Sequence, residues 1–287
     1  MHAKPKRFTL GAFECLVFND YQQEYSYDTL ANNLSAEQLA QVLASQGIQG
    51  DKTTLDYNVL LVKTGEHTIL VDAGIRGGTL KEQMQSVGIP PTEIDLIYLT
   101  HADSDHVGGL VDEDGREGFP NARIVTWKRM WDLWSAEKVL AENENAPEYF
   151  IRYVVPAIRE RVEPVALDTE FIPGFQAIWG RGHSAGHSAL RITSAGETLL
   201  HIGDAVHHLL HIAYPELLCS WDRARYPDEM VRTRRQLLKR AADENALVFG
   251  SHLPFPGLGW VIAKENGWQW QAMEIHESPE VMLQRPW

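Results

Sequence analysis

Residues 101–106, with the sequence HADSDH, concentrate side chains that bind metal ions. Two histidines and two aspartates lie within six positions, after a short apolar run and before the pair Gly108 and Gly109. Imidazole nitrogens and carboxylate oxygens are common ligands of zinc and other divalent ions in proteins. The segment therefore predicts one part of a metal site.

Three more residues of these types follow strand-like stretches farther along the chain. His183 lies in RGHSAGHS, Asp204 ends LLHIGD, and His252 follows ALVFG. Each is followed by a turn or loop containing glycine or proline, where side chains can point into a shared cleft. A single histidine or aspartate is more often structural than a ligand. Coincidence is a poor explanation when every site carries the right residue type in the same context, so we interpret them together as a metal site.

The stretches between these residues predict the elements that position them. Apolar spacing indicates a helix within 27–49 and helices at 80–87, 127–140, 148–161 and 227–243. It also indicates two strands around a turn in 57–74 and strands at 94–100, 123–126, 175–179, 188–193, 197–202 and 246–250. This order predicts a layered α/β fold with the site at one edge of the sheets. We expect one domain over residues 1–287, with residues 1–54 as an N-terminal extension that covers the cleft or lies in a dimer interface.

Composition restricts the classes of function. The 287 residues are 44% hydrophobic and 23% charged, as in soluble globular proteins, and the formal net charge of −13 disfavours a nucleic-acid partner. Two cysteines do not indicate a disulfide framework. No apolar stretch is long enough to cross a membrane, and the N-terminus lacks the apolar core of a signal peptide. We expect a cytoplasmic protein that acts on a small molecule, with a homodimer as one alternative.

Together, these motifs resemble the metallo-β-lactamase superfamily. The pattern of that family is His-x-His-x-Asp-His, then a histidine before Ser or Thr, a Gly-Asp pair, and a late histidine after a strand. The resemblance extends from about Tyr57 to His252, and the segments 119–124, 203–216 and 250–259 are similar to the branch that contains methyl parathion hydrolase and lactonase-like hydrolases. It implies an αββα sandwich that holds two divalent metal ions, with zinc as the first candidate.

By position, the resemblance also implies a role for each candidate ligand. The first metal would be bound by His101, Asp103 and His183, the second by Asp105, His106 and His252, and Asp204 would bridge them. Asp72, in the sequence LVDAG, would orient the metal loop. His187 matches no ligand position, so we interpret it as a buried structural residue.

Asp103 departs from the family pattern, which has histidine at this position. A carboxylate adds negative charge and a harder oxygen ligand, which shifts preference from zinc towards manganese or iron. Because aspartate is also shorter, three interpretations stay open: a two-metal site with Asp103 as a ligand, which we favour; a loosely held first metal; or a site with the second metal only. If Asp103 is a ligand, we expect Asp103→His to raise zinc affinity at the first position.

The two metals imply hydrolysis. They would lower the pKa of a bridging water, and the resulting hydroxide would attack an ester, lactone or phosphotriester. Asp105 would act as a catalytic proton shuttle, because a carboxylate beside the nucleophile can take and return its proton. The alternatives are an iron-dependent oxidoreductase or dioxygenase on the same fold and a non-catalytic metal-binding protein.

Three residues are candidates for the substrate pocket: His207, Trp221 and Phe255. An imidazole closely following Asp204 can hydrogen-bond a substrate or leaving group, although a polar helix or loop face would explain His207 equally well. Aromatic walls suit an apolar substrate.

Overall fold

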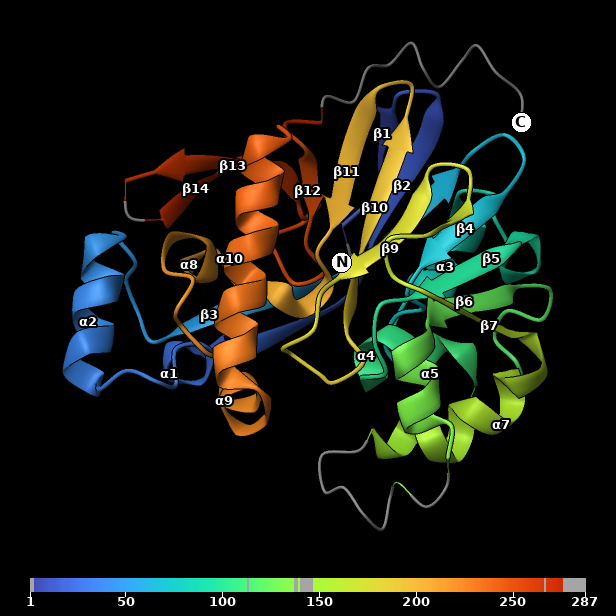
Figure 1. The fold of residues 1–287 in the computed structure, drawn as a ribbon, viewed down its shortest axis with the longest axis horizontal. Helices are drawn as coiled ribbons and strands as arrows, with labels where there is room; N and C mark the ends of the chain where they lie inside the picture. Colours follow the sequence, from blue (N-terminus) through green and yellow to red (C-terminus); the bar gives the residue numbers. More distant parts are fainter. Residues whose placement is uncertain (1–2, 113, 137–138, 140–146, 266, 276–287) are drawn as a thin grey trace.

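The computed structural model describes residues 3–112, 114–136, 139, 147–265 and 267–275, and these form two packed β-sheets flanked by helices (Figure 1). The first sheet has the order β1 (Lys6–Leu10), β2 (Phe13–Ser26), β3 (Lys52–Lys63), β4 (Thr68–Val71), β5 (Leu96–Leu99), β6 (Arg123–Trp127) and β7 (Val162–Val165). The second has the order β14 (Gly267–Ala272), β13 (Leu258–Lys264), β12 (Leu247–Phe249), β11 (Glu197–His201), β10 (Ser188–Ser194), β9 (Phe175–Trp179) and β8 (Glu170–Ile172).

Both sheets are mixed. Pairing is antiparallel from β1 to β4 and parallel from β4 to β7, while in the second sheet the β11–β12 pair is parallel and its other pairs are antiparallel. The carboxyl ends of parallel neighbours lie at one edge of a sheet, so the loops after β5, β11 and β12 can converge.

Short helices connect the strands. The α-helices are α1 (Tyr27–Leu30), α2 (Ala36–Ser45), α3 (Leu80–Ser86), α4 (Ser104–Val107), α5 (Lys128–Trp134), α7 (Val155–Ile158), α8 (Leu210–Ala213), α9 (Ser220–Arg225) and α10 (Pro227–Asp243). Single turns of other helix types are η1 (Pro91–Glu93), η2 (Gly108–Leu110), η3 (Phe150–Val154), η4 (Arg159–Arg161) and η5 (Gly203–Ala205).

Alternating apolar residues build the layers. In β3, Val59 and Leu61 pack with helices α3, α5 and α7, whereas Leu60 and Val62 face the second sheet. Helix α10 covers the outer face of the second sheet. A strand that is apolar on both faces is expected where both faces are covered. The predicted αββα sandwich is therefore confirmed.

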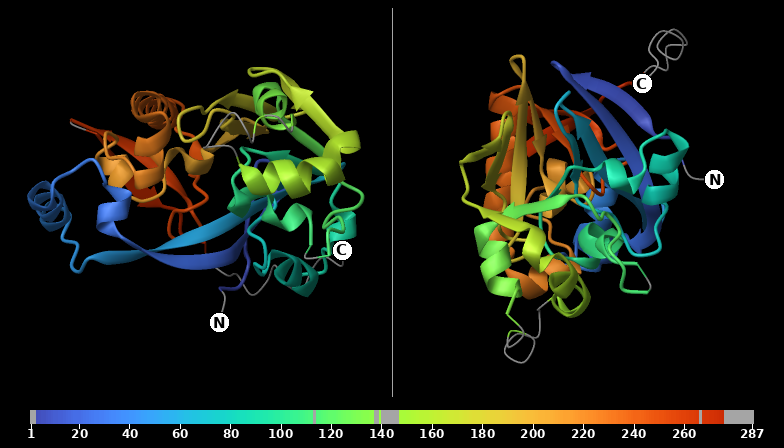
Figure 2. Two further views of the ribbon diagram at one scale, coloured as in Figure 1. Left: turned by 90° about the horizontal axis from the view of Figure 1, so that it is seen from below. Right: turned by 90° about the vertical axis from the view of Figure 1, so that its right-hand side faces the viewer.

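The N-terminal residues are part of this framework. Residues 6–26, which we expected within an added extension, form β1 and β2, and β2 pairs with β3 from Glu14 to Ser26. The far ends of β2 and β3 reach past the rest of the sheet towards α1, as Figure 2 shows. Helices α1 and α2 pack there against α8 and residues 217–219. This region consequently contributes to the wall of the site.

Two predicted helices differ from the structure. The helix expected at 127–140 ends at Trp134, and residues 137–138 and 140 of that prediction lie outside the described part of the chain. The stretch 148–161 forms η3, α7 and η4 in place of one continuous helix. Pro156 explains this difference, because it has no backbone N–H to donate and its ring clashes with the preceding turn. Among the described residues, no helix is long and apolar enough to span a membrane.

Candidate metal centre

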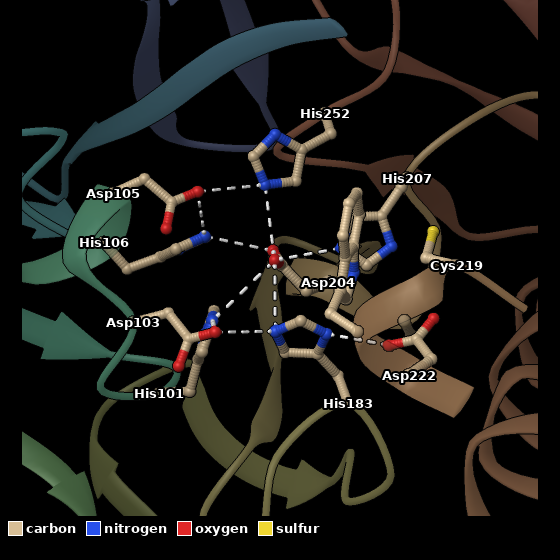
Figure 3. Close-up of polar contacts among 12 residues, drawn as sticks. His101, Asp103, Asp105, His106, His183, Asp204, His207, Cys219, Asp222 and His252 are labelled. Atoms are coloured by element: carbon tan, nitrogen blue, oxygen red, sulfur yellow. Dashed lines mark hydrogen bonds and ion pairs between the residues drawn. The ribbon is translucent and has the colours of Figure 1, made fainter. Parts of the chain in front are cut away.

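All seven predicted ligands meet at one edge of the two sheets (Figure 3). The loop after β5 brings His101, Asp103, Asp105 and His106, and the loop between β9 and β10 brings His183. Asp204 follows β11 and His252 follows β12. The side chains form two groups that match the predicted division, with Asp204 between them.

The first group contains His101, Asp103 and His183. Asp103 Oδ2 lies 3.1 Å from His183 Nε2 and 3.9 Å from His101 Nε2. Ligand atoms at this separation can share one ion, since metal–ligand bonds of about 2.0–2.2 Å span such distances. The short aspartate side chain therefore lies close enough to both histidines to share an ion with them.

The second group contains Asp105, His106 and His252. Asp105 Oδ2 lies 3.4 Å from Nε2 of both histidines. Asp204 Oδ1 is 3.1 Å from His106 Nε2, and its Oδ2 is 3.6 Å from His183 Nε2. One carboxylate thus faces both groups, which is the arrangement expected of a bridging ligand.

Hydrogen bonds at Nδ1 orient every histidine of the two groups. His106 Nδ1 contacts Asp72 Oδ2 at 2.7 Å and His183 Nδ1 contacts Asp222 Oδ1 at 3.0 Å. The remaining pairs are His252 with the carbonyl of Asp56 and His101 with the hydroxyl of Thr100, both at 3.0 Å. Because the Nδ1 atoms face these oxygens, the Nε2 atoms point to the centre. Such outer contacts fix the ring orientation and raise ligand basicity.

Asp72 and His187 support the loops, as we expected of them. Asp72, at a positive φ of 63°, accepts hydrogen bonds from the backbone and hydroxyl of Thr100 in addition to its contact with His106. His187 is fully buried, and its Nε2 accepts from the backbone N–H of Asp204 at 3.1 Å. Burial lowers the pKa of His187 to about 4, which keeps the ring neutral. The two residues hold the loops that carry the ligands.

The electrostatics of the centre favour a cation. Burial alone would raise the pKa of the Asp103 and Asp204 carboxyls, but neighbouring imidazoles outweigh it and hold both pKa values below their ordinary range. Burial lowers the pKa of His101 well below its ordinary value, with the charge of His106 adding to the effect. Burial would lower the pKa of His106, His183 and His252 as well, but the neighbouring carboxylates outweigh it and raise all three, to about 10 for His183 and about 9 for His252. These three rings would therefore release protons when a metal binds, because a metal ligand must be a neutral imidazole.

Among the candidate ligands, three buried polar atoms make no hydrogen bond within the described part of the chain: His101 Nε2, His106 Nε2 and Asp204 Oδ1. Buried polar atoms are almost always paired, because an unpaired one loses its hydration without compensation. All three point into the centre between the two groups (Figure 3). Two divalent ions therefore fit this set of side chains.

An open cavity of about 320 Å³ lies over the centre. His207 and Trp221 line it, as predicted, and Trp221 Nε1 donates to His207 Nε2 at 3.2 Å. Phe255 is absent from the lining residues that the structure describes; it packs on the core between the sheets. Further wall residues are Gln23, Tyr25, Leu55, Tyr57, Ile75 and Ser104.

Several residues at the site were not predicted. Asp222 is fully buried behind His183, and the fully buried Arg234 lies 3.5 Å from Asp222 while donating to the carbonyls of Ala205 and Pro215. Arg225 donates to Asp103 Oδ2 at 2.9 Å. In the sequence, these residues lie in charge-rich helices that are typical of a solvated surface. No local signal could have separated them from their neighbours.

Comparison with known proteins agrees with this geometry. AidC, a dizinc quorum-quenching lactonase solved with a product, superposes with a TM-score of 0.85 at 27% identity, over 96% of this chain and 99% of AidC. The hydrolase AbOPH of the β-lactamase superfamily gives 0.83 at 25% identity, over 96% and 100%. The exodeoxyribonuclease WalJ of Streptococcus pneumoniae is 27% identical over 89 residues, which are 31% of this chain and only 29% of WalJ.

The family model of the metallo-beta-lactamase superfamily matches residues 53–252. That range starts at the beginning of β3 and ends at the last candidate ligand, so it includes strands of both sheets and all seven candidate ligands. The family model covers more than half of the chain, and we conclude that the chain belongs to the metallo-beta-lactamase superfamily.

Proposed function

We propose that this protein hydrolyses a neutral, moderately apolar ester, lactone or organophosphate with two divalent metal ions, of which zinc is the first candidate. One observation carries the proposal: two groups of three ligands flank a shared Asp204 at the base of an open cavity with aromatic walls. The similarity to a dizinc lactonase and to AbOPH supports the same class of reaction.

The chain's own residues would hold both ions. The first ion would be bound by His101, Asp103 and His183, and the second by Asp105, His106 and His252. Asp204 would bind both ions. When bound, the ions would supply Lewis acidity for the carbonyl or phosphoryl oxygen and a lowered pKa for water. The buried groups that contact the Nδ1 atoms hold the imidazole rings in place. The ligand side chains would therefore need little rearrangement when a metal binds.

Asp105 and His207 would have separate roles at the cavity. Asp105 is an aspartate of the second group whose side chain is 20% exposed and lines the cavity, so it can take and return a proton there. His207 Nε2 lies 3.2 Å from Asp204 Oδ2, on the cavity wall. Because its Nε2 accepts from the indole N–H of Trp221, the role of His207 in the pocket would be to hold that indole in the cavity wall.

The cavity wall favours an uncharged substrate with an apolar portion. The apolar surface of the wall comes from Tyr25, Tyr57, Trp221, Leu55 and Ile75. Trp221 packs edge-on against Tyr25. Among the lining residues that the structure describes, none is lysine or arginine. Together with the net charge of −13, this gives a phosphodiester backbone little to bind, so we do not propose DNA as the substrate despite the short match to WalJ.

The test is a substrate panel with defined metals. Metal-free protein is reconstituted with zinc, manganese, cobalt or iron and assayed on p-nitrophenyl esters, lactones and paraoxon-like triesters. We expect turnover of at least one class with zinc, and a fall of at least 100-fold in kcat for Asp105→Asn, because that variant loses both a ligand and a proton acceptor. Absence of turnover on every substrate with every metal would overturn the proposal.

A further inference from the structure

Arg225 occupies a position beside the first group of ligands. It is the last residue of α9, and its Nη1 donates to Asp103 Oδ2 at 2.9 Å and to the carbonyl of His183 at 3.2 Å. The same nitrogen lies 3.4 Å from His183 Nε2. The guanidinium group therefore contacts two of the three side-chain atoms that would bind the first metal.

The ion pair is enclosed by the fold. The side chains of Arg225 and Asp103 are only 21% and 23% exposed. A smaller cavity of about 120 Å³ is lined by both residues and by Trp134, Ala185 and Tyr226. A charge pair in such surroundings is screened less by water and salt than a surface pair. Its field on the metal site is therefore only partly screened.

The charges of Arg225 and Asp103 are complementary. The family pattern has a neutral histidine at position 103, so the aspartate adds one negative charge to the ligand set. Arg225 adds one positive charge at the same oxygen, which restores the formal charge that the site would have with histidine. A guanidinium cannot lose its proton in a protein, so this compensation is permanent.

We propose that Arg225 sets the metal affinity of the first position, by offsetting the charge of Asp103 and by competing with the metal for Asp103 Oδ2. The first metal is then held more weakly than the second and exchanges more readily. This inference rests on the proposed two-metal function for its setting, but it concerns binding and is tested without substrate. It also alters our expectation for Asp103→His, because that variant leaves Arg225 without its carboxylate.

The test is a zinc titration of metal-free full-length protein, by calorimetry and by competition with a chromophoric chelator. We expect Arg225→Gln to lower the Kd of the weaker zinc site at least tenfold, because the substitution removes a positive charge beside the zinc ion. Asp103→His should weaken that site at least tenfold, and the double variant should return to within about fivefold of the wild type. Opposite single effects that cancel in the double variant are the signature of charge compensation.

Two control variants isolate the charge of Arg225. Arg225→Lys keeps the positive charge and should stay within threefold of the wild type. Arg235→Gln removes an exposed arginine that pairs with Glu216, away from the ligands, and should also change nothing. If Arg225→Gln folds poorly, as judged by circular dichroism, the comparison of Asp103→His with the wild type still tests the sign of the effect.

The possible results separate this inference from the proposed function. A wild type that binds one zinc and an Arg225→Gln variant that binds two would support it. An unchanged weaker site in Arg225→Gln, or a tighter site in Asp103→His alone, would overturn it. If the zinc affinities are as expected but no substrate in the panel is turned over, the proposed hydrolase function would be wrong. The inference about Arg225 would still be supported.

Discussion

At the scale of single residues, the centre depends on contacts behind the ligands as much as on the ligands. His183 is the clearest case, because its Nδ1 faces the buried carboxylate of Asp222, which the buried Arg234 neutralises in part. Burial alone would raise the pKa of Asp222, but hydrogen bonding to His183 and the charges of His207 and Arg234 lower it to below its ordinary range. His183 thus receives support from an ionised carboxylate.

Asp222→Asn should weaken zinc binding at the first position by about 10- to 100-fold, the usual effect of losing such a partner. The amide is nearly the same size but is a weaker acceptor for the imidazole N–H. It also no longer offsets the buried charge of Arg234, so the variant should be less stable than the wild type. Zinc competition titration measures the effect, with the exposed Asp228→Asn on α10 as a matched control. Equal affinities of Asp222→Asn and the wild type would show that this contact does not support metal binding.

At the scale of elements, Asp20 connects β2 to the start of α3. It is fully buried, and its two carboxylate oxygens accept from the backbone N–H groups of Ile75 and Leu80, both at 2.7 Å. A Cβ at Gly74 or Gly78 would lie within about 2.3 Å of the same carboxylate, so only glycine fits there. This packing fixes the loop that leads to Ile75 in the cavity wall.

Asp20 should make stability depend on pH. Burial raises its pKa from 3.8 to about 6, against the lowering effect of its hydrogen bonds. Because the folded state holds the proton more tightly, this stabilising contribution is complete below about pH 4 and is lost as the pH rises through 6. Urea denaturation should show the wild type losing about 1 kcal/mol relative to Asp20→Asn between pH 5 and pH 7.5. Parallel pH profiles for the two proteins would contradict this, and exposed Asp28→Asn is the control.

The sequence predicted some elements better than others. Helix α10 matches the expected 227–243, because its amphipathic spacing is regular and Pro227 marks its start. Strand β2 was missed, since its second half, from Tyr21 to Ser26, is largely polar and lacks apolar alternation. That half is a strand because it pairs with β3, from Tyr57 back to Lys52, and pairing with a distant segment has no local signature.

At the scale of the whole molecule, the centre joins two halves. The loop of His101 to His106 extends from the first sheet, whereas His183, Asp204 and His252 extend from the second (Figure 3). Direct hydrogen bonds also join the two sheets near the centre: the backbone N–H of Ser188 donates to the carbonyl of Thr100 at 2.9 Å, and Asn58 Nδ2 donates to the carbonyl of Leu253 at 2.7 Å. Ions bound by both sets would therefore stabilise the association of the sheets.

Removal of metal should consequently lower the melting temperature. An ion present at about 1,000 times its Kd adds about 4 kcal/mol to stability, and for a chain of this size that corresponds to a shift on the order of 5–10 °C. Calorimetry of chelated, zinc-loaded and zinc-restored protein measures this shift. Asp105→Asn, which lacks one ligand, should show a smaller difference. Melting temperatures that agree within about 1 °C with and without zinc would contradict the prediction.

The ligand types and the layered fold could be predicted because each depends on local spacing: a run of HADSDH, a histidine or aspartate at a strand end, and apolar alternation within strands. The division of the ligands into two groups came from the resemblance to the metallo-β-lactamase superfamily. Tertiary structure alone decided which side chains surround the ligands. It placed Asp222 and Arg225 against His183 and Asp103, brought Tyr25 and Tyr57 to the cavity, and removed Phe255 from it. The contacts of Asp222 with His183 and of Arg225 with Asp103 join residues that are 39 and 122 positions apart. The physical reason is that contact, burial and charge pairing depend on distance in space, which a one-dimensional pattern does not record.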